Sequence, residues 1–210
     1  MIKVLIADDH AILRRGLIEI LAREIAGLTC GEAGDAQQAL IQVQNQPWDL
    51  VILDITMPGR SGLDLLKELK REKPKLPILI LSMHPEDQYG RRVLQAGASG
   101  YMNKESAPEE LIKAVRKVLA GGRYVSSTLA DRLAFDLHGE TGRPRHDILS
   151  ARELEVLLMM ASGRTPSQIA EGLHLSVTTV STYRVRIMEK MDMTTNAQLM
   201  YYVLSNHLLD

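Results

Sequence analysis

Acidic side chains follow two apolar runs of the sequence at the point where each run ends. Asp8 and Asp9 come directly after residues 3–7, and Asp54 follows residues 50–53. Short apolar runs rich in β-branched residues are typical of strands that are buried on both faces of a parallel sheet. The carboxyl ends of parallel strands meet at one edge, where ligands bind. We therefore expect the three carboxylates to lie close together.

A hydroxyl and an ammonium group are expected at the same edge. The apolar run 77–81 ends in Ser82, and the short run 98–102 leads to Lys104. Three carboxylates are hard oxygen ligands that suit Mg²⁺, and a divalent cation offsets their mutual repulsion. The carboxylate of Asp54 could then attack a phosphoryl group and form an acyl phosphate, while Mg²⁺ and Lys104 stabilise the charge on its oxygens. Ser82 would donate a hydrogen bond to the new phosphoryl group.

The elements that would position these groups alternate between strand and helix. Amphipathic helical patterns cover residues 11–25, 36–44, 63–69, 86–96 and 108–120, and a fifth short strand is predicted at residues 28–33. This alternation predicts a parallel sheet with helices on both faces. Taken alone, Asp54 could equally be a turn residue ahead of Pro58 and Gly59. The companion groups at the other strand ends favour a functional site.

Together these residues resemble a two-component response-regulator receiver domain. The resemblance is carried by Asp8, Asp9, Asp54, Met57, Pro58, Gly59, Ser82, Tyr101 and Lys104. It covers residues 1–122 and implies an α/β flavodoxin-like (βα)5 fold with Asp54 as the phosphoacceptor. Such a domain catalyses only its own phosphoryl transfer and dephosphorylation, so no conventional enzyme is expected.

The resemblance also implies the role of each site residue. The implied protein ligands of Mg²⁺ are the carboxylates of Asp8, Asp9 and Asp54 and the backbone carbonyl of Thr56. Ser82 and Tyr101 would form the hydroxyl and aromatic switch pair, and Lys104 would stabilise the phosphoryl group. His10 directly follows the acidic pair; it could neighbour the metal ligands, but an exposed loop histidine is the favoured interpretation.

After residue 122 the sequence changes character. Residues 123–147 form a linker that becomes polar and contains Gly and Pro, in which Ser126 and Ser127 could cap a short helix. That helix would carry Asp131, Leu133 and Phe135.

Residues 148–210 contain only helical patterns. A capping box formed by Ser150 and Glu153 opens a helix that Gly163 stops, and further helices are expected at 166–173, 177–191 and 196–207. The fold class predicted for the whole chain is therefore α/β plus all-α, with a four-helix second domain.

The second and third of these helices, joined by the tight turn 174–176, form a helix-turn-helix. Alone this is a weak signal. It becomes specific through residues 149–153, Ile169 with Ala170, Ser176 with Thr179 and Val180, and residues 187–191. These residues resemble the LuxR-type module of the NarL/FixJ response regulators over residues 148–208, which implies binding to double-stranded DNA.

Helical spacing assigns the two faces of the helix at residues 177–191. Val180, Tyr183, Ile187 and Met191 share one face and should be buried. The residues expected to reach the major groove are Ser181, Thr182, Arg184, Val185 and Arg186. The residues expected to contact backbone phosphates are Thr178, Thr179 and Lys190. For the two arginines, a merely solvated helix face is the alternative.

The charge of the second domain argues against tight binding by a single copy. Residues 147–210 hold five basic and seven acidic residues, five minus seven, or a net charge of −2. Because electrostatic affinity scales with the phosphates that a protein neutralises, one copy should bind DNA weakly. We therefore expect a homodimer on paired promoter half-sites.

The remaining composition indicates the compartment. The single cysteine, Cys30, fits a reducing cytosol, and no apolar run approaches the length of a membrane span. Asp8 and Asp9 come too early for a signal peptide. A cytoplasmic protein without membrane contact is expected.

The function predicted from these observations is a DNA-binding transcriptional regulator that a sensor histidine kinase phosphorylates on Asp54, and that forms a homodimer when phosphorylated. A protein-binding adaptor is the alternative, supported by the acidic second domain. An enzyme with an aspartyl-phosphate intermediate is disfavoured, because such enzymes typically carry Asp where this sequence has Thr56.

Overall fold

The computed structural model describes residues 1–57, 61–106, 108–130, 144–206 and 208–209. The chain divides into two compact units, one within residues 1–139 and the other within residues 140–210. Each unit has its own buried core. No helix in the described part of the chain is long and apolar enough to cross a membrane.

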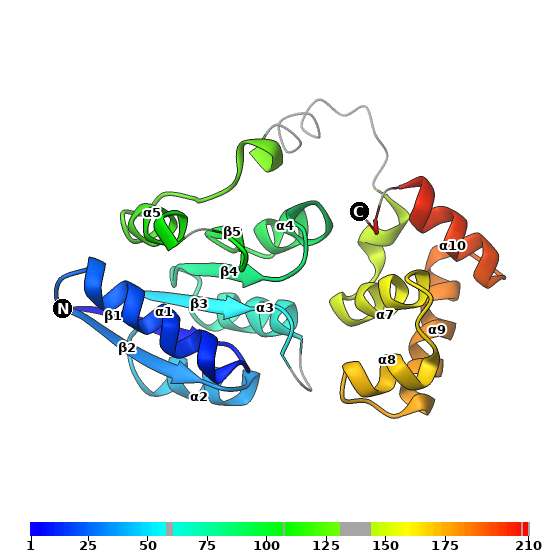
Figure 1. Cartoon of the computed structure of the whole chain (residues 1–210), viewed down its shortest axis with the longest axis horizontal. Helices are drawn as coiled ribbons and strands as arrows, with labels where there is room; N and C mark the ends of the chain where they lie inside the picture. Colours follow the sequence, from blue (N-terminus) through cyan, green and yellow to red (C-terminus); the bar gives the residue numbers. More distant parts are fainter. Residues whose placement is uncertain (58–60, 107, 131–143, 207, 210) are drawn as a thin grey trace. The chain divides into compact units, whose positions relative to one another are not determined.

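The first unit is built on a five-stranded parallel sheet (Figure 1). Its strands are β1 (Ile2–Ala7), β2 (Leu28–Ala33), β3 (Leu50–Asp54), β4 (Ile78–Ser82) and β5 (Gly100–Asn103). Their order across the sheet is β2-β1-β3-β4-β5, so the chain reverses its direction of winding next to β1. The flavodoxin-like prediction is confirmed, and in such sheets the ligand site lies at this switch point beyond the carboxyl ends of the strands.

Helices cover both faces of the sheet. They are α1 (Ala11–Glu24), α2 (Ala36–Asn45), α3 (Gly62–Glu72), α4 (Glu86–Gln95) and α5 (Pro108–Leu119). Helices α1 and α5 share a core with alternate strand residues such as Ile6, Ile52 and Leu81. Leu5 and Val51, the alternating neighbours, are fully buried toward the other face. Because both faces are covered, each central strand reads as a continuous apolar run.

Residues beyond α5 also pack on the first unit. Tyr124 forms a parallel bridge with Gly100 of β5, and the Tyr101 N–H donates to its carbonyl over 3.1 Å. The Ser126 hydroxyl accepts from the Leu129 N–H at 3.0 Å and so caps a helical turn, while Leu129 is buried. The remainder of the predicted linker helix, with Asp131, Leu133 and Phe135, lies outside the described residues.

The second unit is all-α. It contains the 3₁₀ turn η1 (Arg145–Ile148) and the helices α7 (Ala151–Ala161), α8 (Pro166–Gly172), α9 (Val177–Met191) and α10 (Asn196–Ser205). The four-helix prediction is confirmed, and so is the capping box of Ser150 and Glu153 at the start of α7. The turn between α8 and α9 places His174 at a φ of 53°, a left-handed conformation that is uncommon outside glycine. No periodic pattern of residues predicts η1.

Candidate functional site

Three carboxylates meet at the carboxyl edge of the sheet. Asp8 and Asp9 follow β1, and Asp54 ends β3. Together with His10 they offer ligand atoms that all lie within 4.8 Å of one another. Asp8 and Asp54 are almost fully buried, whereas about a quarter of the Asp9 side chain, 26%, is exposed. The adjacency of β1 and β3 produces this cluster, because residues 46 positions apart leave neighbouring strands at the same edge.

Lys104 forms ion pairs with the two buried members of this cluster. Its Nζ lies 2.6 Å from Asp8 Oδ2 and 2.8 Å from Asp54 Oδ2. The Lys104 N–H donates to the Ser82 carbonyl at 2.8 Å, so the lysine is anchored to the end of β4. Removing the lysine would leave two buried carboxylates without a cation, which is costly. Lys104 therefore stabilises the folded site in addition to offering a cation to a bound group.

Burial sets the acidity of Asp54. It raises the pKa of this carboxyl from 3.8 to about 6, against the lowering effects of Lys104 and of the Thr56 N–H, which donates to Asp54 Oδ1 at 3.0 Å. Burial lowers the pKa of Lys104, but the Asp54 and Asp8 carboxylates outweigh it and leave that pKa raised. At neutral pH the site thus holds an ionised acid and an ammonium group. An ionised carboxylate in a desolvated site is a competent nucleophile.

The donor set fits a hard divalent cation. Carboxylate oxygens of Asp8, Asp9 and Asp54 converge. Thr56, whose carbonyl completes the predicted ligand set, lies two residues beyond the end of β3. Mg²⁺ binds oxygen ligands at about 2.0–2.1 Å and usually keeps several waters, so a few carboxylate oxygens suffice to hold it. The acidic pocket is therefore consistent with metal binding.

Ser82 and Tyr101 are both directed at the loop between β4 and α4. Both side chains are fully buried. The Ser82 hydroxyl accepts from the His84 N–H at 3.1 Å, and the Tyr101 hydroxyl donates to the His84 carbonyl at 2.6 Å. One loop residue is thus held from both sides by the pair that the sequence suggested as a switch.

His10 contacts the acidic cluster more closely than its sequence position indicated. Its ring is 67% exposed, as expected for a loop histidine, yet Nδ1 lies 3.1 Å from Asp8 Oδ1 and 3.0 Å from Asp9 Oδ1. Its N–H also donates to Asp8 Oδ1 at 2.8 Å. The only signal in the sequence was its place directly after two aspartates.

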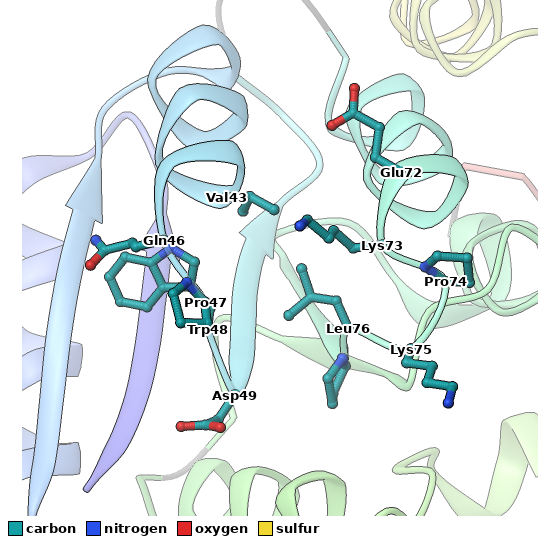
Figure 2. A pocket seen from close by; sticks show the side chains of 11 residues that line it. Val43, Gln46, Pro47, Trp48, Asp49, Glu72, Lys73, Pro74, Lys75 and Leu76 are labelled. Atoms are coloured by element: carbon teal, nitrogen blue, oxygen red, sulfur yellow. The ribbon is translucent and has the colours of Figure 1, made fainter.

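A cavity of about 580 Å³ lies at the opposite edge of the sheet (Figure 2). Val43, Trp48 and Leu76 line it, with residues that precede β3 and β4. Trp48 packs against Gly31 of β2, and its indole N–H donates to the Gln42 carbonyl at 3.0 Å. Because this cavity faces the amino ends of the strands, it is separate from the carboxylate cluster.

In the second unit, α9 has the two faces that the spacing predicted, with one exception. Val180, Ile187 and Met191 are buried, whereas Tyr183 is only half-buried. The exposed face of α9 carries Ser181, Thr182, Arg184, Val185 and Arg186. Tyr183, which the spacing predicts to be buried, is therefore covered only in part.

The hydroxyls on the exposed face donate within the helix. Ser181 Oγ donates to the Val177 carbonyl and Thr182 Oγ1 to the Thr178 carbonyl, each at 3.0 Å. Their lone pairs therefore point outward as acceptors, which suit an amino group on a base edge. Thr179 Oγ1, at 2.8 Å from Ser176 Oγ, belongs to the N-terminal cap of α9.

Two of the predicted DNA contacts have partners within the protein. Lys190 Nζ lies 2.7 Å from Glu153 Oε2, which is nearly fully buried. Arg184 Nε donates to Asn196 Oδ1 at 2.9 Å. These contacts orient both cations, and the one to Glu153 also ties α9 to α7.

Comparison with known families divides the chain in the same way. Residues 4–116 match the family described as a response regulator receiver domain, and residues 147–203 match the bacterial regulatory proteins of the luxR family. The response regulator GacA of Pseudomonas aeruginosa is 36% identical over 212 residues, covering 100% of this chain and 99% of that protein. The transcriptional activator protein ExaE of Pseudomonas putida is 39% identical over 208 residues, covering 98% and 97%.

Solved structures of RcsB are similar over both units. RcsB from Salmonella enterica serovar Typhimurium, bound to promoter rprA in the presence of phosphomimetic BeF3⁻, is 29% identical with a TM-score of 0.63, covering 98% of this chain and 100% of that chain. A structure of two RcsB dimers bound to two parallel DNAs is 28% identical with a TM-score of 0.59, covering 97% and 98%.

Proposed function

The chain belongs to the response regulators that join a receiver domain to a LuxR-type DNA-binding domain, and on this premise we propose that phosphoryl transfer to Asp54 controls its binding to promoter DNA. The chain is a response-regulator transcription factor, not a conventional enzyme. The observation that carries the proposal is the contact of 2.8 Å between Lys104 Nζ and Asp54 Oδ2 in a buried acidic pocket. It places a nucleophile and a cation for the transferred group side by side.

The side chains of this pocket suit transfer from a phosphohistidine of a sensor kinase. The Asp54 carboxylate attacks phosphorus, the bond from phosphorus to the histidine nitrogen breaks, and the leaving imidazole takes up a proton. Lys104 has three N–H donors and can exchange a carboxylate oxygen for a phosphoryl oxygen. Mg²⁺, held by Asp8, Asp9, Asp54 and the Thr56 carbonyl, would supply compensation for the negative charge on the transferred oxygens.

The buried side chains of Ser82 in β4 and Tyr101 in β5 would respond to the new phosphoryl group. The Ser82 hydroxyl accepts from the His84 N–H at 3.1 Å. We expect its side chain to turn when its O–H donates to a phosphoryl oxygen, and this draws the hydroxyl away from that N–H. Loss of this contact frees one side of the loop, and Tyr101 holds the other side through the His84 carbonyl. The loop and the start of α4 are thus the two-state element that phosphorylation would bias.

Recognition of DNA is assigned to α9. Its exposed face carries Arg184 and Arg186 and no acid among its predicted contacts. Of the seven acidic residues in 147–210, six lie outside α9 and one, Glu189, lies near its C-terminal end, and this weakens the adaptor alternative that the net charge supported. RcsB, bound to DNA as dimers, supports binding as a homodimer to paired half-sites. Because its target is chromosomal promoter DNA, we place the protein in the cytoplasm.

The first test is chemical labelling of Asp54. The protein is incubated with a small acyl-phosphate donor and Mg²⁺, and phosphate incorporation is measured by intact-mass spectrometry. Asp54→Ala should abolish labelling, whereas Asp49→Ala, at the other end of the same strand, should leave it unchanged. Undiminished labelling of the Asp54 variant would show that another residue accepts the phosphoryl group.

The second test is capture of genomic DNA fragments with and without the donor at near-physiological salt. We expect a small set of two-fold related sites that is enriched only after phosphorylation. Equal enrichment in both conditions would mean that phosphorylation regulates something other than DNA binding.

A further inference from the structure

A second cavity, about 500 Å³ in volume, lies beside the recognition helix within the second unit. Residues from α7, α8, α9 and α10 line it, among them Ile169, Val180 and Met200. Two arginines, Arg164 and Arg184, also line it, and none of its described lining residues is acidic. Two cations therefore share one concave site with apolar walls. Low-dielectric walls strengthen the field of cations in a cleft and concentrate anions there.

The geometry of these arginines leaves their charge available to a ligand. Arg184 uses its Nε donor on Asn196 Oδ1 at 2.9 Å, which fixes the guanidinium plane. The four N–H donors on its other two nitrogens make no further hydrogen bond within the described residues. Within that part of the chain no hydrogen bond or ion pair involves the Arg164 guanidinium, whose Nη1 lies near Gly172, and both side chains are exposed. Paired N–H donors of this kind bind phosphate through two parallel hydrogen bonds.

We propose that this cleft binds a backbone phosphate of DNA, clamped between Arg164 and Arg184. The inference rests on the proposed DNA-binding function and changes the part assigned to Arg184, from reading guanine to gripping the backbone. Ser181 lines the same cleft and lies on the exposed face of α9. A phosphate in the cleft would therefore flank the groove that α9 enters.

The proposal explains how an acidic domain retains DNA. The net charge of residues 147–210 is −2, five basic minus seven acidic residues, yet the local field at the cleft comes from two cations without an acid in the lining. Phosphate contacts supply affinity and orientation but no sequence information. The cleft should thus fix the register of α9, while Thr182, Val185 and Arg186 remain for the bases.

The test measures how DNA affinity depends on salt for Arg164→Gln and Arg184→Gln in the full-length phosphorylated protein. Two duplexes are used: one with a site recovered by selection from random sequence, and one with that site scrambled. The association constant K falls as salt rises, and losing one phosphate contact should make the slope of log K against log salt less steep by about 0.9. Between 1 M and 0.15 M salt, the variant should therefore gain about fivefold less affinity than the wild type does. Both duplexes should lose affinity by a similar factor. Arg23→Gln, an exposed arginine of α1 in the first unit, controls for the change in net charge.

Two further variants separate clamping from charge alone. Asn196→Ala keeps every charge but releases Arg184, and it should weaken both duplexes without reducing the slope as far as Arg184→Gln does. Arg184→Lys should retain the slope and lose affinity, because an ammonium cannot make the two parallel hydrogen bonds. Thermal unfolding monitored by circular dichroism checks that each variant folds.

Three results would overturn the clamp. Slopes equal to that of Arg23→Gln for both arginine variants would show that neither touches a phosphate. A changed base preference of Arg184→Gln in a repeated selection would show that Arg184 reads bases. Absence of DNA binding by the phosphorylated wild type would remove the proposed function itself, which distinguishes that failure from the other two.

Discussion

Three charged side chains of the acidic pocket are in direct contact with one another through Lys104. Lys104 lies 2.6 Å from Asp8 and 2.8 Å from Asp54, and all three are buried. Even so, burial raises the pKa of Asp54 to about 6. The folded protein therefore keeps an ionised carboxylate in a place where its charge costs free energy. This cost is what makes the carboxylate reactive toward a phosphoryl group and responsive to a cation.

Asp54→Asn should stabilise the receiver domain at neutral pH. Because the pKa of Asp54 is higher in the folded state than its ordinary 3.8, its stabilising contribution is complete below pH 3.8 and is lost as the pH rises through 6. Removing the charge should raise the free energy of unfolding at pH 7 by about 1–3 kcal/mol. The gain should shrink as the pH falls toward 4, and also when Mg²⁺ is added to the wild type.

Urea unfolding followed by the fluorescence of Trp48 measures this effect. Trp48 is the single tryptophan of the chain and lies in the receiver domain. The control is Glu19→Gln, an exposed carboxylate of α1, which should change stability little. An Asp54→Asn variant no more stable than wild type at pH 7 would contradict the raised pKa.

At the scale of elements, the segment after α5 joins the site to the rest of the receiver domain. Tyr124 pairs with β5 next to Tyr101, and its N–H donates to the Ser99 carbonyl at 2.9 Å. The Ser126 hydroxyl contacts Glu86, the first residue of α4, and the Ser126 N–H donates to the same carboxylate at 3.2 Å. Since α4 follows the loop that Ser82 and Tyr101 hold, this segment is placed to sense its movement.

Glu86→Gln combined with Ser126→Ala should loosen this segment. Removing a partly buried charged hydrogen bond typically costs about 1.5–3 kcal/mol locally. We expect faster amide hydrogen exchange across residues 124–130 and little change in β1. Ser127→Ala, whose side chain is exposed, is the matched control. Equal exchange in the two variants would mean that the contacts with Glu86 do not hold the segment.

A second pairing of elements depends on Lys190. Burial raises the pKa of Glu153, but the Lys190 ammonium and the backbone and hydroxyl of Ser150 outweigh it and leave that pKa lowered. This contact over 2.7 Å links α9 to the capping box at the start of α7. Lys190 was predicted from the sequence as a phosphate contact, and the structure gives it this structural partner as well.

Lys190→Gln should therefore destabilise the second domain as well as weaken DNA binding. Because Lys190 is 43% exposed, solvent screening limits the expected loss to about 1 kcal/mol. Glu153 has a lowered pKa, so its contribution is present above pH 4.5 and is lost as the pH falls through the lowered value. A double-mutant cycle with Glu153→Gln, measured by thermal unfolding, gives the coupling. A coupling energy of zero between Lys190 and Glu153 at pH 7 would show that their contact does not stabilise the domain, and would leave phosphate binding as the role of Lys190.

At the scale of the whole molecule, we expect a domain with few basic groups to gain DNA affinity by pairing with a second copy. Each copy offers one α9 and one cleft, and the net charge of −2 over residues 147–210 opposes long-range attraction to DNA. Linking two binding events through a dimer raises the effective concentration of the second and can exceed single-site affinity by about 10²–10⁴. Phosphorylation would then act on DNA binding through the population of dimers.

We expect the phosphorylated chain to bind a duplex with two half-sites at least about 100-fold more tightly than a duplex with one. Moving the half-sites apart by half a helical turn should remove the gain, because a dimer presents its recognition helices to one face of DNA. Fluorescence anisotropy at fixed salt measures both. The same affinity for one and two half-sites would show that the protein binds as a monomer.

Much of the fold and of the site was predictable from local features of the sequence. Strands buried on both faces must be continuously apolar, so β1, β3 and β4 stand out, and the residue that ends each of them must lie at one edge. Ser150 and Glu153 predict the start of α7, because residues at this spacing form a capping box that satisfies two free N–H groups at the helix start. The positions of Asp8, Asp54, Ser82 and Lys104 follow from the same logic.

Tertiary structure alone decided what each of these groups touches. The contact between Lys190 and Glu153 joins residues 37 positions apart, and the cleft formed by Arg164 and Arg184 requires four helices at once. Tyr183 is half-buried although its spacing favours burial, because the neighbouring elements set the width of the covered face. Periodicity fixes which side of an element is apolar. Distances between charges, and hence pKa values and binding sites, depend on how the elements pack.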